Sequence, residues 1–259
     1  MIKRSISGLM LLLLMALFFV KAGYSTGITV MFVLNMLVFS ELVRIFGAGR
    51  PLIILSLCLT VLCFFSGVMR PDTMLPVFFF SLSIFFIYSI VRDNSGLDHM
   101  ILFCYQFLLI NTMFVCATHL FVSRSRDLLL YVLLLVFLYD TSAYFFGVRF
   151  GTNRITPVIS PKKSWEGLLG ATFTVLVAAI FFIYNTELYP RSVLGFITVI
   201  LVIFAPAGDL AISILKRNRG VKDSGSIIPG HGGILDRVDS FIFLIPIIYF
   251  LGEHYVWFN

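Results

Sequence analysis

Nine apolar runs dominate this sequence and constrain its fold more than any other feature. A transmembrane helix needs about 20 mostly apolar residues. Hydrophobic residues make up 59% of the 259-residue chain and charged residues only 12%, whereas soluble domains carry about 25% charged residues. We therefore predict an all-α fold, a polytopic membrane helix bundle of about nine spans; eight spans plus a re-entrant segment also fit. The runs are residues 6–20, 26–43, 51–69, 74–91, 100–122, 128–147, 168–186, 192–214 and 239–258.

The chain shows no internal repeat and no low-complexity linker, so we predict a single membrane domain over residues 1–259. Residues 1–127 supply hydrophobic spans, and residues 128–259 supply spans together with the most polar loops. The first run follows Lys3 and Arg4, as in a signal peptide, but it ends in Phe-Phe-Val-Lys without a small-residue cleavage site. We expect it to remain as an uncleaved span.

The distribution of Lys and Arg predicts the orientation of the bundle. In the nine-span arrangement, 14 of the 19 Lys and Arg residues fall on one side and 5 on the other. The positive-inside rule places the richer side in the cytoplasm, together with the N-terminus. The two most basic segments, residues 148–167 and 215–238, share that side.

Polar residues in the first half are few and are expected to be structural. Glu41 lies near the cytoplasmic end of the second run, where we expect it to reach the membrane interface rather than a polar cavity. Asn111 and His119 lie in the fifth run and are expected to form interhelical hydrogen bonds. The four cysteines lie in apolar runs without a CxxC pair, which indicates packing rather than a metal or disulfide framework.

The second half contains an acid inside a span and then a basic loop. Asp140 lies in the sixth run, and an acid within a membrane helix marks a functional site or a buried partner by default. The loop that follows contains Lys162, Lys163 and Ser164 immediately before the next run. Ser164 is a suitable N-cap, and a helix N-terminus there would favour an anion. A positive anchor beside an interfacial Trp explains the same residues equally well.

A second acid and a dense polar stretch follow the eighth run. Asp209 lies near the cytoplasmic end of that run, where Pro206 and Gly208 favour a break in the helix. Residues 209–239 hold four of the chain's 13 acids and five of its 19 basic residues. The polar residues after Asp209 include Ser213, Lys216, Arg217, Arg219, Lys222, Asp223, Ser224, His231, Asp236, Arg237 and Asp239.

This mixture of charges predicts more than a topology signal, which needs only Lys and Arg. Mg²⁺ binds proteins through one or two carboxylates plus substrate phosphates, and Lys and Arg suit phosphate oxygens directly. The glycines of Pro229-Gly230-His231-Gly232-Gly233 allow backbone amides to approach a phosphate. The stretch therefore indicates metal-assisted phosphoryl or nucleotidyl transfer at the membrane surface. A surface loop rich in salt bridges is the simpler alternative.

The same stretch resembles the signature of the CDP-diacylglycerol synthases, also called phosphatidate cytidylyltransferases. The signature is matched by Ser213, Lys216-Arg217, Lys222-Asp223, Pro229-Gly230-His231-Gly232-Gly233 and Asp236-Arg237-Val238-Asp239. Three flanking elements are similar to the family as well: Asp140 with Ala143-Tyr144 and Gly147, Ser160-Pro161-Lys162-Lys163 with Glu166-Gly167, and Gly208-Asp209-Leu210. The resemblance covers about residues 139–240. Ile212 departs from it, because many members have Glu before the signature Ser.

The resemblance implies the reaction CTP + phosphatidic acid → CDP-diacylglycerol + pyrophosphate, with Mg²⁺ as cofactor and a second cation as an option. It implies CTP, phosphatidic acid and membrane lipids as partners, no nucleic acid, and a homodimer as one assembly to test. The expected location is a bacterial inner membrane with the site facing the cytoplasm, which agrees with the charge-derived orientation because CTP is cytosolic.

Roles within this reaction follow from residue chemistry. We expect Asp209 and Asp236 to ligate the metal, with Asp239 next, and Lys216, Arg217 and Lys222 to hold the phosphates of CTP. Lys162 and Lys163 would bind the lipid phosphate or the same triphosphate. Asp140 and Glu166 are expected to support these groups. Ser213, Asp223, His231, Gly232, Gly233 and Arg237 complete the expected substrate contacts.

Three other functions remain open at this point. An ion-coupled transporter would account for Asp140 and Asp209, but it explains the glycine-rich loop and the basic cluster poorly. A cytidylyltransferase or kinase for another lipid phosphate or alcohol is compatible with the signature. An inactive relative gains weight from Ile212.

Overall fold

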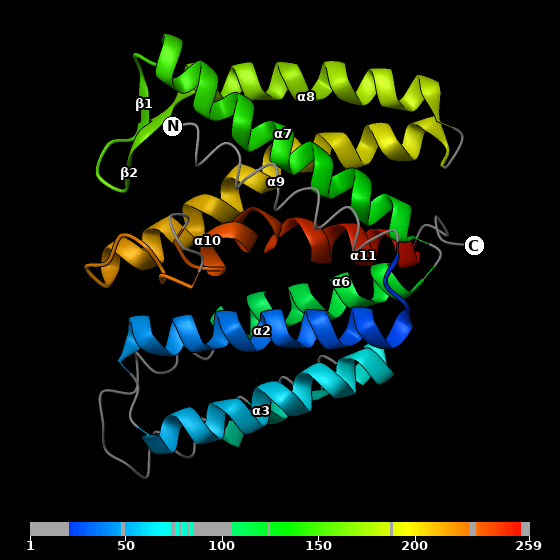
Figure 1. Cartoon of the computed structure of the whole chain (residues 1–259), viewed down its shortest axis with the longest axis vertical. Coiled ribbons are helices and arrows are strands. Elements are labelled where there is room, and N and C mark those ends of the chain that lie inside the picture. The colour runs from blue at the N-terminus through cyan, green and yellow to red at the C-terminus, as the bar shows by residue number, and fades with distance from the viewer. Residues whose placement is uncertain are drawn as a thin grey trace. The chain divides into compact units, whose positions relative to one another are not determined.

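A computed structural model describes most of the chain as helices. The described residues are 21–47, 50–73, 76–77, 79–81, 83–84, 105–123, 125–186, 189–227 and 232–254. Among them, five helices are long and apolar enough to cross a membrane, and each coincides with a predicted run. They are α2 (Tyr24–Phe46), α3 (Arg50–Met69), α7 (Arg126–Phe150), α8 (Trp165–Asn185) and α9 (Arg191–Asn218) (Figure 1). The prediction of a helical membrane bundle is confirmed, and the number of nine spans stays a prediction.

Two further predicted runs have helical structure of a different kind. The described part of run 100–122 starts as the π-helix η2 (Tyr105–Asn111) and continues as α6 (Thr112–Val122). Run 239–258 starts as the 3₁₀ turn η3 (Asp239–Phe241), just after the short α10 (Leu235–Val238), and continues as α11 (Leu244–His254). Pro246 lies in the first turn of α11, where the missing N–H has no intrahelical partner to lose. The short 3₁₀ turn η1 (Pro71–Thr73) follows α3, and run 6–20 lies outside the described residues.

A β-hairpin interrupts the helices in the loop between α7 and α8, so the all-α prediction missed one element. Strand β1 (Arg154–Thr156) pairs antiparallel with β2 (Ser160–Ser164), with Arg154 opposite Ser164. The strands are short and polar, so the alternation of apolar residues that signals a strand is absent from the sequence. The hairpin carries Lys162 and Lys163 on β2.

The chain divides into two compact units. Unit 1 comprises residues 1–122 and 219–238, and unit 2 comprises residues 123–218 and 239–259. Unit 1 therefore joins the N-terminal helices to the glycine-rich part of the signature stretch.

In unit 1, buried polar side chains connect the helices. The Asn35 side-chain amide of α2 donates to Asn111 Oδ1 at 2.7 Å, and Gln106 donates to Asn35 Oδ1 at 3.3 Å. His119 Nε2 of α6 lies 2.9 Å from the carbonyl oxygen of Gly67 in α3. The predicted interhelical roles of Asn111 and His119 are confirmed.

In unit 2, α7 and α8 pack closely because small residues meet between them, and Figure 1 shows the two helices side by side. A Cβ added to Gly167 would lie 2.8 Å from the carbonyl oxygen of Ala143 and 3.1 Å from the Gly147 Cα. Small residues permit this close backbone approach in membrane helices. The α9 helix continues through Pro206, so the predicted break at this position is wrong. One missing N–H does not end a helix whose remaining backbone hydrogen bonds have no competitor in an apolar environment.

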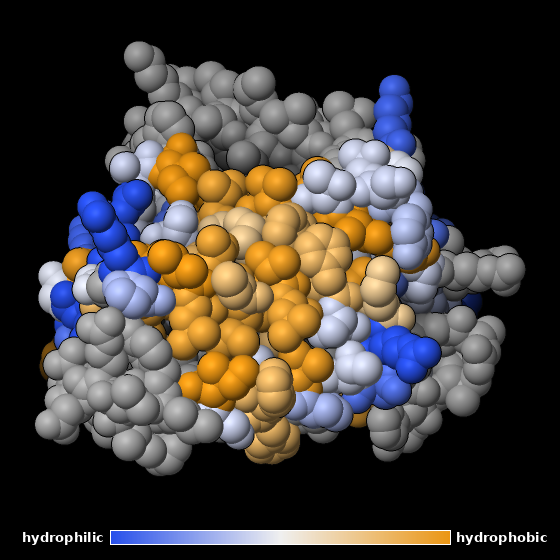
Figure 2. Space-filling view, turned by 90° about the horizontal axis from the view of Figure 1, so that it is seen from below, coloured by the Kyte–Doolittle hydropathy of each residue, from blue (hydrophilic) through white to orange (hydrophobic). Residues whose placement is uncertain are grey.

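The helices present apolar side chains outward, as lipid contact requires. Figure 2 shows a face where hydrophobic side chains dominate and hydrophilic ones gather toward the edges. Helix α3 alone exposes Ile54, Leu57, Leu62 and Phe65. A soluble protein rarely exposes such a contiguous apolar surface, so the face indicates a membrane environment.

Candidate active site

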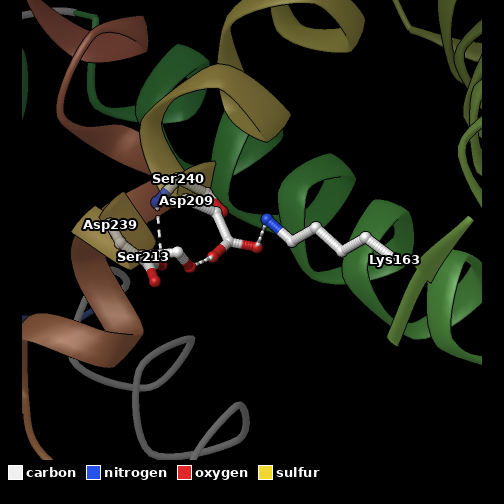
Figure 3. A network of polar contacts seen from close by, with 5 residues as sticks. All are labelled: Lys163, Asp209, Ser213, Asp239 and Ser240. Atoms are coloured by element: carbon white, nitrogen blue, oxygen red, sulfur yellow. Dashed lines mark hydrogen bonds and ion pairs between the residues drawn. The ribbon is translucent and has the colours of Figure 1, made fainter. Parts of the chain in front are cut away.

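Asp209 stands at the centre of a polar cluster in unit 2. Its Oδ2 lies 2.6 Å from Lys163 Nζ, and its Oδ1 accepts a hydrogen bond from the Ser213 hydroxyl at 3.3 Å. Figure 3 shows the Lys163 side chain extending to Asp209 from one side while Ser213 lies on the other. The hairpin and α9 thus bring together two predicted site residues that are 46 positions apart in the sequence.

Asp239 is the second carboxylate of this cluster (Figure 3). Its side chain is buried, and its Oδ1 accepts from the backbone N–H of Ser240 at 2.9 Å. The carboxylates of Asp209 and Asp140 act electrostatically on Asp239, and the ammonium of Lys216 opposes their effect. A group of nearby carboxylates that repel one another is a favourable place for a cation.

Gly208 explains how the two carboxylates come to share this region. A Cβ at Gly208 would overlap the carbonyl oxygen of Asp239, so only glycine allows the backbone of η3 to lie against α9 here. The sequence context of Gly208 favours a break in the helix. In the structure the helix continues, and Gly208 instead permits a close backbone contact next to Asp209. That requirement is steric, and no left-handed backbone conformation is involved.

Hydrogen bonds at the two ends of the hairpin, next to the start of α8, hold Lys163 in position. Ser164 caps α8, because its Oγ accepts the backbone N–H of Gly167 at 3.1 Å, which confirms the predicted N-cap. Glu166 accepts hydrogen bonds from the hydroxyl of Thr152 at 2.7 Å and from the side-chain amide of Asn153 at 2.9 Å. Glu166 thus ties the start of the hairpin to α8 and supports Lys163 indirectly.

The basic end of α9 contributes two more predicted residues to unit 2. Lys216 is buried, at 8% exposure, and acts electrostatically on Asp239. Arg217 Nε donates to the carbonyl oxygen of Ile159 at 3.0 Å, which anchors the turn of the hairpin to α9. Arg217 therefore has a structural contact beside its predicted role in phosphate binding. Lys162 is exposed on β2, and Asp140 is exposed on α7.

The remaining predicted residues belong to unit 1. Asp236 Oδ2 accepts the backbone N–H groups of Ser224 at 3.0 Å and Gly233 at 3.3 Å. Gly232 has φ of +83°, a left-handed conformation that favours glycine. His231 lies outside the described residues, so its predicted role stays untested. Three further predicted residues, all exposed, are Lys222, Asp223 and Arg237.

Sequence reasoning missed the role of Glu41. Its side chain is fully buried, so the expectation that it reaches the membrane interface is wrong. Its carboxylate accepts the backbone N–H groups of Ile234 and Leu235 and the hydroxyl of Ser224, each at 2.9 Å. The sequence signal for this role is an acid within an apolar run, but its place near the end of that run favours the interface instead.

The donor set fits a hard divalent cation. Asp209 and Asp239 provide carboxylate oxygens beside Lys163 and Lys216, which suit phosphate. Within the described parts of the chain, no three His, Cys, Asp or Glu side chains lie close enough to hold a metal by themselves. That arrangement suits Mg²⁺, which uses one or two carboxylates and takes its other ligands from water and substrate.

Comparison with known proteins decides the family. The model of the cytidylyltransferase family matches residues 2–255, nearly the whole chain. The chain belongs to this family. The match includes the N-terminal helices, which the sequence motif alone did not cover.

Curated relatives of the family share the name that the signature suggested. A phosphatidate cytidylyltransferase of Haemophilus influenzae is 48% identical over 124 residues, covering 46% of this chain and 43% of that protein. One from Staphylococcus aureus is 46% identical over 129 residues, covering 49% and 50%. One from Staphylococcus haemolyticus is 46% identical over 136 residues, covering 50% and 51%. The chain thus matches about half the length of these relatives, and the resemblance to phosphatidate cytidylyltransferases is confirmed.

Proposed function

We propose that the protein transfers the cytidylyl group of CTP to phosphatidic acid, giving CDP-diacylglycerol and pyrophosphate. The observation that carries the proposal is the cluster in unit 2, where Lys163 meets Asp209 beside the buried Asp239. Membership of the cytidylyltransferase family and the names of the curated relatives support this choice. Ion-coupled transport would not explain why Lys163 of the hairpin pairs with Asp209 of α9.

In this reaction, a phosphate oxygen of phosphatidic acid attacks the α-phosphorus of CTP. The new oxygen–phosphorus bond forms as the bond to the β-phosphate breaks, and pyrophosphate leaves with that electron pair. The attacking phosphate is ionised at neutral pH, so no side chain has to remove a proton. Both reactants are anions, and catalysis therefore consists mainly of positioning and charge neutralisation.

The residues of the chain divide this work by their charge. Lys216 and Lys163 offset the negative charge of the phosphates, and Arg217 holds the hairpin that carries Lys163. Asp209 and Asp239 would hold Mg²⁺ in unit 2, and the metal-ligand role expected for Asp236 stays a prediction. When bound, Mg²⁺ would neutralise charge that develops on the phosphate oxygens, and a second cation is compatible with the number of carboxylates.

The setting of the reaction is also part of the proposal. We place the site on the cytoplasmic side of a bacterial inner membrane, with nine spans, because 14 of the 19 Lys and Arg residues then face the cytoplasm. Phosphatidic acid enters from the bilayer along apolar helices, and CTP arrives from water. A homodimer is compatible with the exposed apolar surface in Figure 2.

The test is incorporation of radiolabelled CTP into chloroform-soluble lipid by the purified protein in detergent, with phosphatidic acid and Mg²⁺. We expect label in CDP-diacylglycerol and release of one pyrophosphate per lipid. Polyprenyl phosphate replaces phosphatidic acid in a parallel reaction. Label only with the polyprenyl lipid would assign a different acceptor, and no label with either lipid would refute the proposal.

A further inference from the structure

An acid from the N-terminal half of the chain is built into the signature loop of unit 1. The loop, defined here as the described residues 222–227 and 232–236, contains the predicted CTP contact Lys222 and the predicted metal ligand Asp236. Glu41 of α2 is nearly 200 residues away in the sequence, and its side chain is fully buried. Burying a carboxylate costs free energy unless hydrogen bonds replace those it made with water. The partners of Glu41 in the fold therefore need to be identified.

Glu41 and Asp236 together hold the two ends of the signature loop. Glu41 accepts the Ser224 hydroxyl on one side of the loop and the Ile234 and Leu235 N–H groups on the other, each at 2.9 Å. Asp236 accepts the N–H groups of Ser224 and Gly233 at 3.0 and 3.3 Å. Five hydrogen bonds from both ends of the loop therefore converge on two carboxylates.

Two loop glycines allow this approach to Glu41. A Cβ at Gly225 would lie 2.8 Å from Glu41 Oε1. A Cβ at Gly233 would overlap both the Ser224 hydroxyl and the Glu41 carboxylate. The absence of a side chain at Gly233 thus serves the contact with Glu41, in addition to any contact that its amide makes with a phosphate.

We infer that Glu41 is a positioning residue whose carboxylate sets the conformation of the signature loop and thereby the contact of Lys222 with the phosphates of CTP. The inference rests on the proposed function for its substrate, because a different nucleotide would change the ligand that Lys222 meets. The contacts between Glu41 and the loop lie within unit 1 and do not depend on which nucleotide binds. Glu41 does not touch the reacting atoms in this assignment; it acts through the loop.

Glu41→Gln is the decisive substitution, because it keeps the size of the side chain and replaces one acceptor oxygen by a donor. At least one of the three donors then faces an NH₂ group. We expect the KM for CTP to rise roughly tenfold or more, the scale of leaving one buried donor without an acceptor. The KM for phosphatidic acid should stay within about twofold, because Glu41 bonds the loop that carries Lys222, and Lys222 is assigned to CTP.

Asn35→Ala is the matched control. Asn35 lies on the same helix, is equally buried and also bonds across unit 1, but its partners are Asn111 and Gln106 rather than the loop. We expect Asn35→Ala to lower the unfolding temperature and to leave the KM for CTP unchanged. An equal change of KM in both variants, or an unchanged KM in Glu41→Gln, would overturn the inference.

Ser224→Ala keeps the inference testable if Glu41→Gln does not fold. It removes one of the three donors and leaves the two backbone N–H groups on Glu41. We expect a smaller rise of the KM for CTP, about two- to fivefold, on the scale of one hydrogen bond. An unchanged KM for CTP in folded Ser224→Ala would count against the role of the loop contact.

A readout without activity separates this inference from the proposed function. Trypsin cleaves after the loop residue Lys222, which is exposed. We expect Glu41→Gln to be cut there several times faster than the wild type, and Asn35→Ala to be cut at the wild-type rate. Faster cutting in a protein that does not incorporate CTP would support the loop contact and refute the function. Normal cutting together with normal CTP kinetics would refute the loop contact alone.

Discussion

The contact between Gly208 and the Asp239 carbonyl oxygen offers the sharpest test of the site in unit 2. Replacing Gly208 by Ala places a methyl group where that oxygen lies. The obstacle is backbone, so it cannot rotate away as a flexible side chain would. The α9 helix and η3 must separate instead, and the separation changes the position of Asp209 relative to Asp239.

The size of the effect follows from the overlap. Overpacking of this kind costs about 1–3 kcal/mol of stability. A displacement on the order of 1 Å among catalytic groups lowers the rate by about a hundredfold. We therefore expect Gly208→Ala to lower kcat by roughly that factor, with a loss of stability that is too small to unfold the protein.

The assay is CTP incorporation into lipid, combined with thermal unfolding of the purified protein. Gly195→Ala is the matched control, because Gly195 lies in the same helix and a Cβ there meets nothing within 4 Å. Alanine at an open helix position stabilises by up to about 1 kcal/mol. If Gly208→Ala retains a kcat within twofold of Gly195→Ala, the close approach of η3 to α9 does not position the carboxylates.

The other predictions concern the charged groups themselves. Asp209→Ala or Asp236→Ala should lower kcat about a hundredfold, the scale of losing a key electrostatic contact; normal turnover at saturating Mg²⁺ would contradict the metal assignment. Lys222→Ala should chiefly raise the KM for CTP, and an unchanged KM would exclude that role. Lys163→Met should lower kcat at least tenfold more than Lys162→Met, because only Lys163 has its ammonium 2.6 Å from Asp209; equal losses would show that the ion pair does not matter. Removal of divalent cations with EDTA should abolish CTP incorporation and added Mg²⁺ should restore it, whereas activity that persists in EDTA would refute the cofactor.

Much of this architecture was visible in the sequence, because membrane helices leave a strong signal. Runs of about 20 apolar residues predict spans directly, and all five long helices lie where the runs predicted them. The N-cap at Ser164 was readable too, since a cap depends on residues within one turn. The signature residues identified the family because their types and spacing are chemically unusual for a membrane loop.

Some features depended on tertiary contacts and left no local pattern. The β-hairpin is held by pairing between two short polar segments, and neither shows the alternation expected of a strand. Pro206 and Gly208 indicated a helix break by their local preferences. In the fold, α9 continues, and Gly208 serves a close backbone contact that no local preference encodes.

The sequence by itself determined the membrane class, the positions of the long helices and the chemistry of the site residues, because each depends on residue type and short-range spacing. Only the tertiary structure decided which charges meet. Lys163 pairs with Asp209 through the hairpin, and Glu41 binds a loop nearly 200 residues away. Such contacts depend on how distant segments pack, and the position of an acid within an apolar run cannot reveal which backbone amides will surround it.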